Sequence, residues 1–281
     1  METCTKDRLL AVNFHLYKPC NERCRYCFAT FPEVRGQLTA DDAERLVRQL
    51  AEAGTKKLTF VGGEPTLHPA LPRLLRVAHS AKVTTAIVSN GAKLRAALEA
   101  APGAVDWVGL SVDSADEEVQ KQLGRGAGRY VRDSISLFDY VRQRGIRTKL
   151  NTVVTRLNWE EDLSALVRRV SPERWKVFQV LAVNGQNDGS VEPLLITAAQ
   201  FRSFVDRHAA LAAEGLAPVP EDNDAMTGSY LMVDPLGRFF DNVAGRLRFS
   251  RPILEIGIER ALREVQFELA RLQVRGGVYA W

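Results

Sequence analysis

The sequence predicts an α/β protein in which six βα units form a parallel sheet. Apolar runs rich in β-branched residues alternate with helix-period segments over the first two thirds of the chain, as they do in consecutive βα units. Hydrophobic residues make up 46% of the 281 residues, which is ample for a sizeable core. No linker or low-complexity tract interrupts the chain, and α/β barrels routinely use this length for one domain. We therefore expect one structural domain.

Six strands account for the apolar runs, at residues 10–16, 57–61, 84–88, 107–112, 148–154 and 175–181. The helix after the first strand is expected to begin with Thr39 as its N-cap, to carry Asp41 and Asp42 in its first turn, and to end at Gly54. Further helices are expected where apolar residues recur at three- and four-residue spacing, at residues 71–81, 92–100, 130–144, 159–170 and 198–213.

The pattern changes after Gly215. Residues 217–228, APVPEDNDAMTG, have the composition of a loop. Residues 230–242, YLMVDPLGRFFDN, predict a hairpin that turns at residues 234–237, and residues 252–273 predict a last helix. The part of the chain after Gly215 therefore has the pattern of an extension with a different organisation.

Composition excludes several classes of protein. The chain has neither an apolar run of about 20 residues, as a membrane span needs, nor a signal-peptide core near its start. We therefore expect a cytoplasmic protein that does not bind membranes. The net charge of +4 is too small and too dispersed to indicate nucleic-acid binding, but it is compatible with an anionic small substrate. Of the four cysteines, Cys4 stands apart and receives no role.

Four short motifs follow four of the predicted strands. They are CNERCRYC at residues 20–27, GGEP at 62–65, SNG at 89–91 and SVDS at 111–114. In βα folds the polar residues that bind and react lie at the C-terminal ends of the strands, where the loops gather. We therefore expect all four motifs at one rim of the sheet.

Cys20, Cys24 and Cys27 are three thiols within eight residues. Structural zinc normally takes four closed ligands, and no second pair of cysteines stands nearby. His15 could in principle be a fourth ligand, but a lone histidine in a strand is more often a packing residue. An iron–sulfur cube held by three thiolates would leave one iron open to another ligand, which suggests a catalytic cluster.

The CxxxCxxC spacing with Tyr26 before the third cysteine resembles the signature of the radical S-adenosylmethionine (SAM) superfamily. That resemblance implies that Cys20, Cys24 and Cys27 hold a [4Fe–4S] cluster whose fourth iron binds SAM. Gly62, Gly63 and Glu64 are similar to the superfamily's GGE motif, whose backbone and carboxylate would meet the methionine ammonium. The residue types suit this role, because glycine lets the backbone approach a ligand and a carboxylate pairs with an ammonium.

The resemblance extends to one family. Seven blocks of the sequence resemble, in the same order, blocks of the viperin family, and RGGVYAW resembles a further block more weakly. The seven blocks are VNFHLYKPCNERCRYCF, KLTFVGGEP, IVSNG, VDSADEEVQKQLGRG, LNTVVTRLNWEEDL, RWKVFQVL and SYLMVD. The resemblance to this family implies a partial (βα)6 barrel over residues 1–190. It also implies a C-terminal α/β extension, residues 191–281, that covers the active site within the same domain. It also implies conversion of a nucleoside triphosphate to its 3'-deoxy-3',4'-didehydro form by hydrogen abstraction at C4' and loss of water. CTP is favoured, UTP or GTP are alternatives, and an antiviral role is implied.

Cations near the predicted strands suit a triphosphate, which carries about four negative charges and needs several lysines or arginines. The resemblance assigns Lys57, Lys149, Arg174 and Lys176 to phosphate; their alternative role is as strand-edge charges that reach solvent. By the same resemblance, Asn151 contacts the substrate, Tyr230 delivers the last electron or proton, and the residues near SAM are Tyr26, Ser89, Asn90, Ser111 and Arg125. The alternative roles of these residues are loop hydrogen bonds and packing.

Some features depart from animal viperins. Val61 stands where they have a serine beside GGE, which puts the choice of base in doubt, and their N-terminal amphipathic helix is absent from this sequence. We expect a monomer that receives electrons from a donor such as flavodoxin or ferredoxin. Two other kinds of radical SAM enzyme, the GTP cyclase of molybdenum-cofactor synthesis and peptide-maturing enzymes, usually carry further cysteines, and this chain has none after Cys27. A third alternative is a metal-stabilised nucleic-acid-binding module without catalysis.

Overall fold

A computed structural model describes residues 9–281 and shows an open ten-stranded sheet with the order β10-β9-β8-β1-β2-β3-β4-β5-β6-β7. Neighbouring strands from β1 to β7 are parallel, β8 is parallel to β1, and β9 is antiparallel to both β8 and β10. The strands are β1 (Ala11–Tyr17), β2 (Lys57–Gly62), β3 (Thr84–Ser89), β4 (Trp107–Ser111), β5 (Arg147–Val154), β6 (Arg174–Gln179), β7 (Pro218–Glu221), β8 (Leu231–Val233), β9 (Arg238–Asp241) and β10 (Arg248–Pro252).

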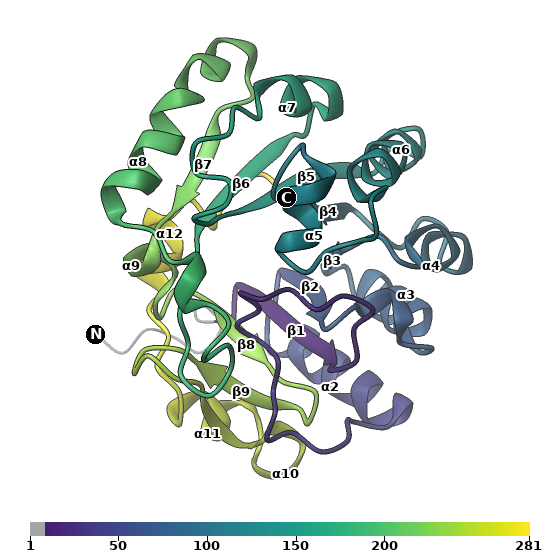
Figure 1. Ribbon diagram of the computed structural model, residues 1–281. Helices are drawn as coiled ribbons and strands as arrows, with labels where there is room; N and C mark the ends of the chain where they lie inside the picture. The colour runs from purple at the N-terminus through teal and green to yellow at the C-terminus, as the bar shows by residue number, and fades with distance from the viewer. Residues whose placement is uncertain (1–8) are drawn as a thin grey trace.

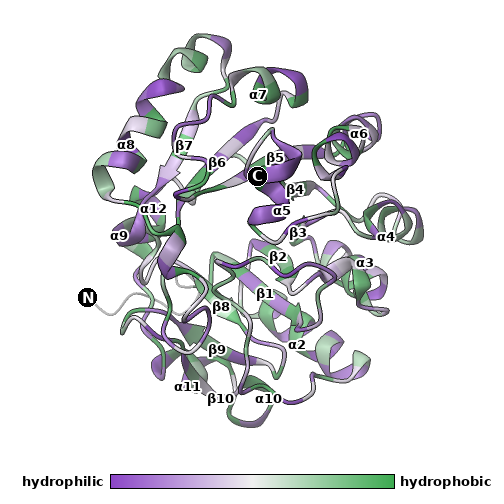
Figure 2. Ribbon diagram, in the orientation of Figure 1, coloured by the Kyte–Doolittle hydropathy of each residue, from purple (hydrophilic) through white to green (hydrophobic). Residues whose placement is uncertain are grey.

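Helices surround the curved sheet on its outer side (Figure 1). The helices of the βα units are α2 (Ala40–Glu52), α3 (Leu71–Ser80), α4 (Leu94–Ala100), α5 (Glu117–Gln122), α6 (Tyr130–Arg142) and α7 (Ser164–Val170). Helix α8 (Ala198–Arg207) follows β6. Helices α3, α6 and α8 each carry both hydrophilic and hydrophobic residues (Figure 2), as expected of helices that cover a sheet with one side. None of the helices within residues 9–281 is both long and apolar enough to cross a membrane.

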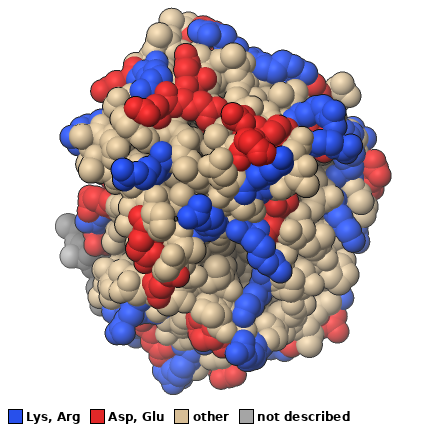
Figure 3. Space-filling view, in the orientation of Figure 1, with Lys and Arg blue, Asp and Glu red and all other residues tan. Residues whose placement is uncertain are grey.

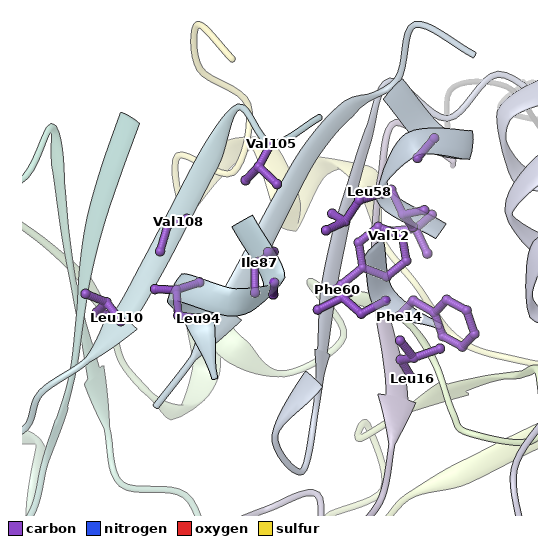
Figure 4. Close-up of a cluster of buried hydrophobic side chains, with 14 of the residues drawn as sticks. Val12, Phe14, Leu16, Leu58, Phe60, Ile87, Leu94, Val105, Val108 and Leu110 are labelled. Atoms are coloured by element: carbon purple, nitrogen blue, oxygen red, sulfur yellow. The ribbon is translucent and has the colours of Figure 1, made fainter. Parts of the chain in front are cut away.

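The main core lies between the sheet and these helices. Val12, Phe14, Leu58, Phe60 and Ile87 come from alternate positions of β1 to β3 and are almost fully buried (Figure 4). Because side chains alternate between the faces of a strand, the intervening residues turn to the inside of the barrel. Each of these core side chains contributes about 1.5–3 kcal/mol by leaving water.

The six strands and the first helix confirm the sequence-based predictions closely. Thr39 accepts a hydrogen bond from the amide of Asp42 at the start of α2, and Gly54 follows the helix with φ of +106°. The predicted hairpin is also present as β8 and β9. The helices expected from periodicity are somewhat shorter than predicted, and the difference is largest for α7, which begins at Ser164, and for α8, which ends at Arg207 and is followed by a 3-10 helix (Ala209–Glu214). Helix α5 was not predicted.

Two predictions for the C-terminal part are wrong. Residues 217–228 contain β7 and helix α9 (Asn223–Met226) instead of a loop, because Pro218 and Pro220 lie on an edge strand, where a proline costs no ladder hydrogen bond on its free side. Residues 252–273 form no single helix. They contain α10 (Ile253–Ile256), α11 (Ile258–Arg263) and the start of α12 (Leu269–Val274), and Gly257, at φ of +82°, ends the first of these.

Candidate active site

A cavity of about 910 Å³ lies inside the barrel. Every site residue proposed from the sequence lines it: the three cysteines, Tyr26, Gly62, Gly63, Glu64, Ser89, Asn90, Ser111, Arg125, Lys57, Lys149, Asn151, Arg174, Lys176 and Tyr230. Lys and Arg side chains gather toward the middle of the face shown in Figure 3, and acidic side chains gather near its upper edge. The structure therefore brings the whole predicted set together in one place.

Strand alternation supplies the polar wall of the cavity. Residues at every second position point inward on β2 (Lys57, Thr59, Val61), on β5 (Lys149, Asn151, Val153) and on β6 (Arg174, Lys176, Phe178). The register of β5 against β6 places Lys149 beside Arg174 and Asn151 beside Lys176. Lys57 and Arg174 are the first residues of their strands, whereas the cysteines follow the end of β1. The thiols and the deepest cations therefore lie at opposite ends of the barrel.

The cysteine loop is fixed by backbone hydrogen bonds to the segment after α5. The amides of Arg23 and Arg25 donate to the carbonyls of Gly124 and Leu123, both at 3.0 Å. Cys20, Cys24 and Cys27 are free thiols that line the cavity. Burial raises the pKa of Cys24 to about 12 and also raises the pKa of Cys20 and Cys27. Cys4 lies outside the described residues.

The thiols suit a cluster better than a single ion. Zinc binds sulfur at about 2.3 Å, so its thiolate ligands must lie within about 4 Å of one another. Within residues 9–281, no three His, Cys, Asp or Glu side chains are close enough to hold one metal ion. An iron–sulfur cube takes each thiolate on a different iron, which suits thiols that are farther apart. His15 is a packing residue, because it is buried against Phe31 and Phe240, and burial lowers its pKa to about 3.

The two glycines of the GGE motif let the second loop pack directly against the cysteine loop. Gly62 has φ of +150°, and a Cβ there would meet the backbone of Tyr17. A Cβ on Gly63 would overlap the carbonyl oxygens of Lys18 and Pro19. The amide of Glu64 donates to the carbonyl of Pro19 at 3.0 Å. Glycine is therefore required here by the approach of two backbones.

Glu64 joins the loops that follow β2 and β3. Its buried carboxylate accepts hydrogen bonds from the Thr66 amide at 3.0 Å, from the Ser89 hydroxyl at 2.7 Å and from the Asn90 amide at 2.8 Å. The Asn90 side chain in turn donates to Asn21 in the cysteine loop at 2.9 Å. Glu64, Ser89 and Asn90 are thus one connected unit at the rim.

A buried ion pair lies on the other side of the cysteine loop. Arg125 is 2.8 Å from Asp113, donates to the Tyr26 hydroxyl at 2.7 Å and donates to Tyr130 at 3.0 Å, and Tyr26 donates to Asp113. Burial, with Asp113 beside it, raises the pKa of Tyr26 well above its usual value. The Arg125 side chain also reaches the Ser111 carbonyl. Each of these polar groups is buried and hydrogen-bonded, so the wall is rigid.

Two lysines meet at the deep end of the cavity. Lys57 and Lys149 are buried and both donate to the hydroxyl of Tyr279, whose ring lies against Trp107 and Arg174. Burial, and to a smaller extent the neighbouring cations, lowers the pKa of Lys57 to about 7 and lowers the pKa of Lys149 well below its usual value. An anion placed here would stabilise the charged form of both lysines.

A second group of charges forms the adjoining wall. Lys176 is 2.5 Å from the buried carboxylate of Glu221 and donates to the Tyr230 hydroxyl at 2.6 Å. Tyr230 donates to Glu221, and Arg275 pairs with the same carboxylate at 3.1 Å. Two buried polar atoms of the cavity, Asn151 Oδ1 and Arg174 Nε, have no hydrogen-bond partner among the described residues. Such atoms suit a bound polar ligand.

Some residues of these networks were not proposed from the sequence, among them Asp113, Glu221, Arg275 and Tyr279. Arg275 and Tyr279 line the cavity, while Asp113 and Glu221 hold its cations. Asp113 stands in the SVDS motif, and Arg275 and Tyr279 stand in RGGVYAW, so each had a local signal. Glu221 had none, because its segment was read as a loop.

Comparisons with known proteins bear on the family of this chain. Residues 16–170 match the model of the radical SAM superfamily. A protein of Lacinutrix mariniflava named S-adenosylmethionine-dependent nucleotide dehydratase is 42% identical over 98% of this chain, which spans 59% of that relative's length. A protein of Flammeovirga pacifica with the same name is also 42% identical, over 96% of both chains.

Solved structures share the fold. Streptococcus suis SuiB bound to S-adenosylmethionine matches 82% of this chain with a TM-score of 0.67, and this chain covers 59% of SuiB. The two sequences are 19% identical, so the match bears on the fold alone. It supports the open α/β barrel and places no substrate.

Proposed function

Because the chain belongs to the viperin-like S-adenosylmethionine-dependent nucleotide dehydratases of the radical SAM superfamily, we propose that it converts CTP to 3'-deoxy-3',4'-didehydro-CTP. UTP and GTP are the alternative substrates. Membership of this superfamily makes it an enzyme with a [4Fe–4S] cluster and SAM as cofactors. The alternative of a non-catalytic nucleic-acid-binding module is therefore set aside.

The observation that carries the proposal is the division of one cavity into a thiol end and a cationic end. The cysteines lie at the C-terminal rim, and Lys57, Lys149 and Arg174 lie toward the opposite end of the same barrel. A nucleoside triphosphate is long enough and anionic enough to bind with its phosphates among these cations and its ribose toward the rim. Four cations on three strands, of which Lys57 and Lys149 are buried and Arg174 and Lys176 half-buried, favour a polyanion over a neutral or peptide substrate.

The rim residues bind the cofactors in this proposal. Cys20, Cys24 and Cys27 hold the cluster, and the bound cofactors together supply the radical that removes a hydrogen atom from the substrate. The glycines Gly62 and Gly63 let the backbone approach SAM, and Glu64 presents a carboxylate to its ammonium. The remaining residues proposed to contact SAM are Tyr26, Ser89, Asn90, Ser111 and Arg125.

The wall residues orient the substrate. Lys57, Lys149, Arg174 and Lys176 bind the triphosphate, and Asn151 contacts the nucleotide between them and the rim. Holding the ribose C4' within about 3–3.5 Å of the reacting atom, in a cavity closed to water, is the main task of the protein. Tyr230 delivers the last electron or proton. Residues 191–281 act as the cover of a barrel formed by residues 1–190, because Tyr230, Arg275 and Tyr279 all reach the cavity from that part.

The cellular setting belongs to the proposal as well. We place the enzyme in the cytoplasm as a monomer that receives electrons from a flavodoxin or ferredoxin and contacts neither membranes nor nucleic acid. Its product would terminate nucleic-acid synthesis, because it lacks a 3'-hydroxyl, which gives an antiviral role.

An anaerobic assay tests the proposed function. The protein with a reconstituted cluster receives SAM, dithionite and one of CTP, UTP, GTP or ATP, and 5'-deoxyadenosine and nucleotide mass are followed. We expect CTP to lose the mass of one water and the Cys24→Ala variant to be inactive. Formation of 5'-deoxyadenosine at the same rate with and without every nucleotide would contradict a nucleotide substrate.

A further inference from the structure

Glu221 is a buried carboxylate that pairs with two cations and to which the proposed function assigns no part in the reaction. It is the last residue of β7, is 0% exposed, and lies next to the cavity wall without being part of the predicted site. The charged and titratable groups that face it are Lys176 of β6, Tyr230 before β8 and Arg275 after α12. These cations, acting against burial, lower the pKa of Glu221, so it is ionised at neutral pH.

The hydrogen bonds fix the direction of the Tyr230 hydroxyl. Lys176 donates to the phenol oxygen at 2.6 Å, so the phenol accepts from the ammonium. Tyr230 donates its own hydrogen to Glu221. The Arg275 guanidinium lies over the Tyr230 ring, 3.6 Å from its centre, and pairs with the far oxygen of Glu221 at 3.1 Å. The phenol hydrogen is therefore directed at a carboxylate and away from the substrate space.

An ion pair that only stabilised the fold would not need the Tyr230 hydroxyl between Lys176 and Glu221. Lys176 and Glu221 already satisfy one another at 2.5 Å, and Arg275 supplies a second cation. The tyrosine adds a hydroxyl whose pKa burial raises well above its usual value, so the carboxylate does not take the proton at rest. The pair is suited to exchange a proton only when Tyr230 loses an electron, because an oxidised phenol is a strong acid.

We propose that Glu221 is a positioning residue that aims the Tyr230 hydroxyl and accepts its proton when Tyr230 gives an electron to the substrate. This inference rests on the proposed function. Once the C4' hydrogen has been removed and the 3'-hydroxyl has left as water with a proton from solvent, the sugar lacks one electron. The O–H bond of Tyr230 then breaks, its electron passes to the sugar and its proton passes to Glu221.

One further step returns Tyr230 and Glu221 to their starting states. The transfer leaves a neutral didehydro nucleotide sugar, a phenoxyl radical at Tyr230 and a carboxylic acid at Glu221. One electron from the flavodoxin- or ferredoxin-type donor reduces the phenoxyl radical, and the proton returns from Glu221 to the phenol. Lys176 stays protonated throughout and stabilises the phenol oxygen by its hydrogen bond.

The first test uses the protein without cofactors. Glu221→Gln keeps the side-chain length and one acceptor oxygen but removes the charge and the basicity. The phenol of Tyr230 is titrated by ultraviolet absorbance, as the difference between each protein and its Tyr230→Phe form. Because Glu221 helps to raise the pKa of Tyr230 and Arg275 lowers it, we expect Glu221→Gln to lower this pKa. An unchanged pKa would overturn the pairing.

The second test measures coupling in the reconstituted enzyme with CTP. We expect Glu221→Gln to form 5'-deoxyadenosine but to raise its ratio to didehydro nucleotide about tenfold or more, because a missing proton acceptor costs about 10²–10⁴ in rate. Glu221→Asp should restore part of the coupling. Glu264→Gln, in an exposed pair with Arg251, is the matched control and should behave as wild type.

Affinity for CTP separates a proton-accepting role from a structural one. The Gln variant loses a negative charge beside the cavity, so its affinity for CTP should not fall. A normal product ratio, or weaker CTP binding, would overturn the inference, whereas a lower melting temperature is expected in either case because Gln leaves Lys176 and Arg275 without their counter-charge. If wild-type protein formed no 5'-deoxyadenosine in response to any triphosphate, the proposed function would fail with it, while the phenol titration would still decide whether Glu221 and Tyr230 are paired.

Discussion

Lys57 and Lys149 are two lysines whose protonation is strongly opposed by burial. Burial, with the neighbouring cations, lowers the pKa of Lys57 to about 7 and lowers the pKa of Lys149 well below its usual value, so burial disfavours the charged form of both lysines when no anion is bound. A triphosphate raises both pKa values. Binding of CTP should therefore take up protons near neutral pH, and the affinity should fall as pH rises above 7.

Calorimetry in two buffers of different ionisation enthalpy measures this proton uptake. Titrations with CTP at several pH values then give the slope of the affinity. Binding heats that do not depend on the buffer would show that both lysines are already charged in the free protein.

The substitution Lys149→Met separates function from stability at the same position. Removing this buried amine should stabilise the ligand-free protein, because burial and the neighbouring cations disfavour its charged form. Stabilisation by CTP, about 2.7 kcal/mol when the ligand is present at 100 times its Kd, should be largely lost. Urea unfolding with and without CTP measures both effects. The exposed Lys56→Met is the control; a Lys149→Met protein that CTP still stabilised fully would contradict the phosphate assignment.

Asp113 should be essential to the stability of the rim, because it is fully buried and neutralises Arg125. It also accepts hydrogen bonds from Tyr26 and from the Val153 amide. Asp113→Asn leaves a buried guanidinium unpaired, which should cost about 3–5 kcal/mol. Glu214→Gln, at the exposed pair with Arg168, should leave the free energy of unfolding almost unchanged, because solvent screens that pair. Equal unfolding free energies for the two variants would argue against a buried pair.

At the scale of the elements, the contact between the cysteine loop and the GGE loop can be tested through Gly63. A Cβ here overlaps the carbonyl oxygens of Lys18 and Pro19, so one loop must move. Gly63→Ala should lose cluster retention as well as stability. Gly103→Ala is the control, because its φ is +72° but its Cβ would meet open space, so it should cost only about 1–2 kcal/mol. Iron content after reconstitution measures retention, and a full complement in Gly63→Ala would contradict the account.

Strands and helices were predicted well where their signal lies within their own sequence, and poorly where they depend on contacts with distant residues. The strands from β1 to β6 and helix α2 have periodic apolar residues and, for α2, the Thr39 cap, so the sequence predicted them within a few residues. Strand β7 consists of Pro218, Val219, Pro220 and Glu221, and its pairing with β6 depends on tertiary contact. The break at Gly257 was missed because apolar residues continue on both sides of it.

The parts of the candidate site that could be predicted from the sequence were likewise those that depend on local sequence motifs. The position of loops at the C-terminal ends of strands predicted that the four motifs share a rim, whereas Lys149, Asn151 and Lys176 were assigned to the substrate by resemblance. Nothing local indicated that Tyr279 lies between Lys57 and Lys149, or that Arg275 and Lys176 share Glu221. These contacts join residues more than 40 positions apart and require the complete fold.

The molecule as a whole is arranged to hold a sugar between a cluster end and a phosphate end, and isotope transfer tests that arrangement most directly. CTP carrying deuterium at C4' is incubated with the reconstituted enzyme, SAM and dithionite under anaerobic conditions. The account predicts 5'-deoxyadenosine with one deuterium and a nucleotide product without it. Deuterium retained in the nucleotide, with unlabelled 5'-deoxyadenosine, would show that the C4' hydrogen is not the one presented to the reacting centre and would contradict the proposed reaction.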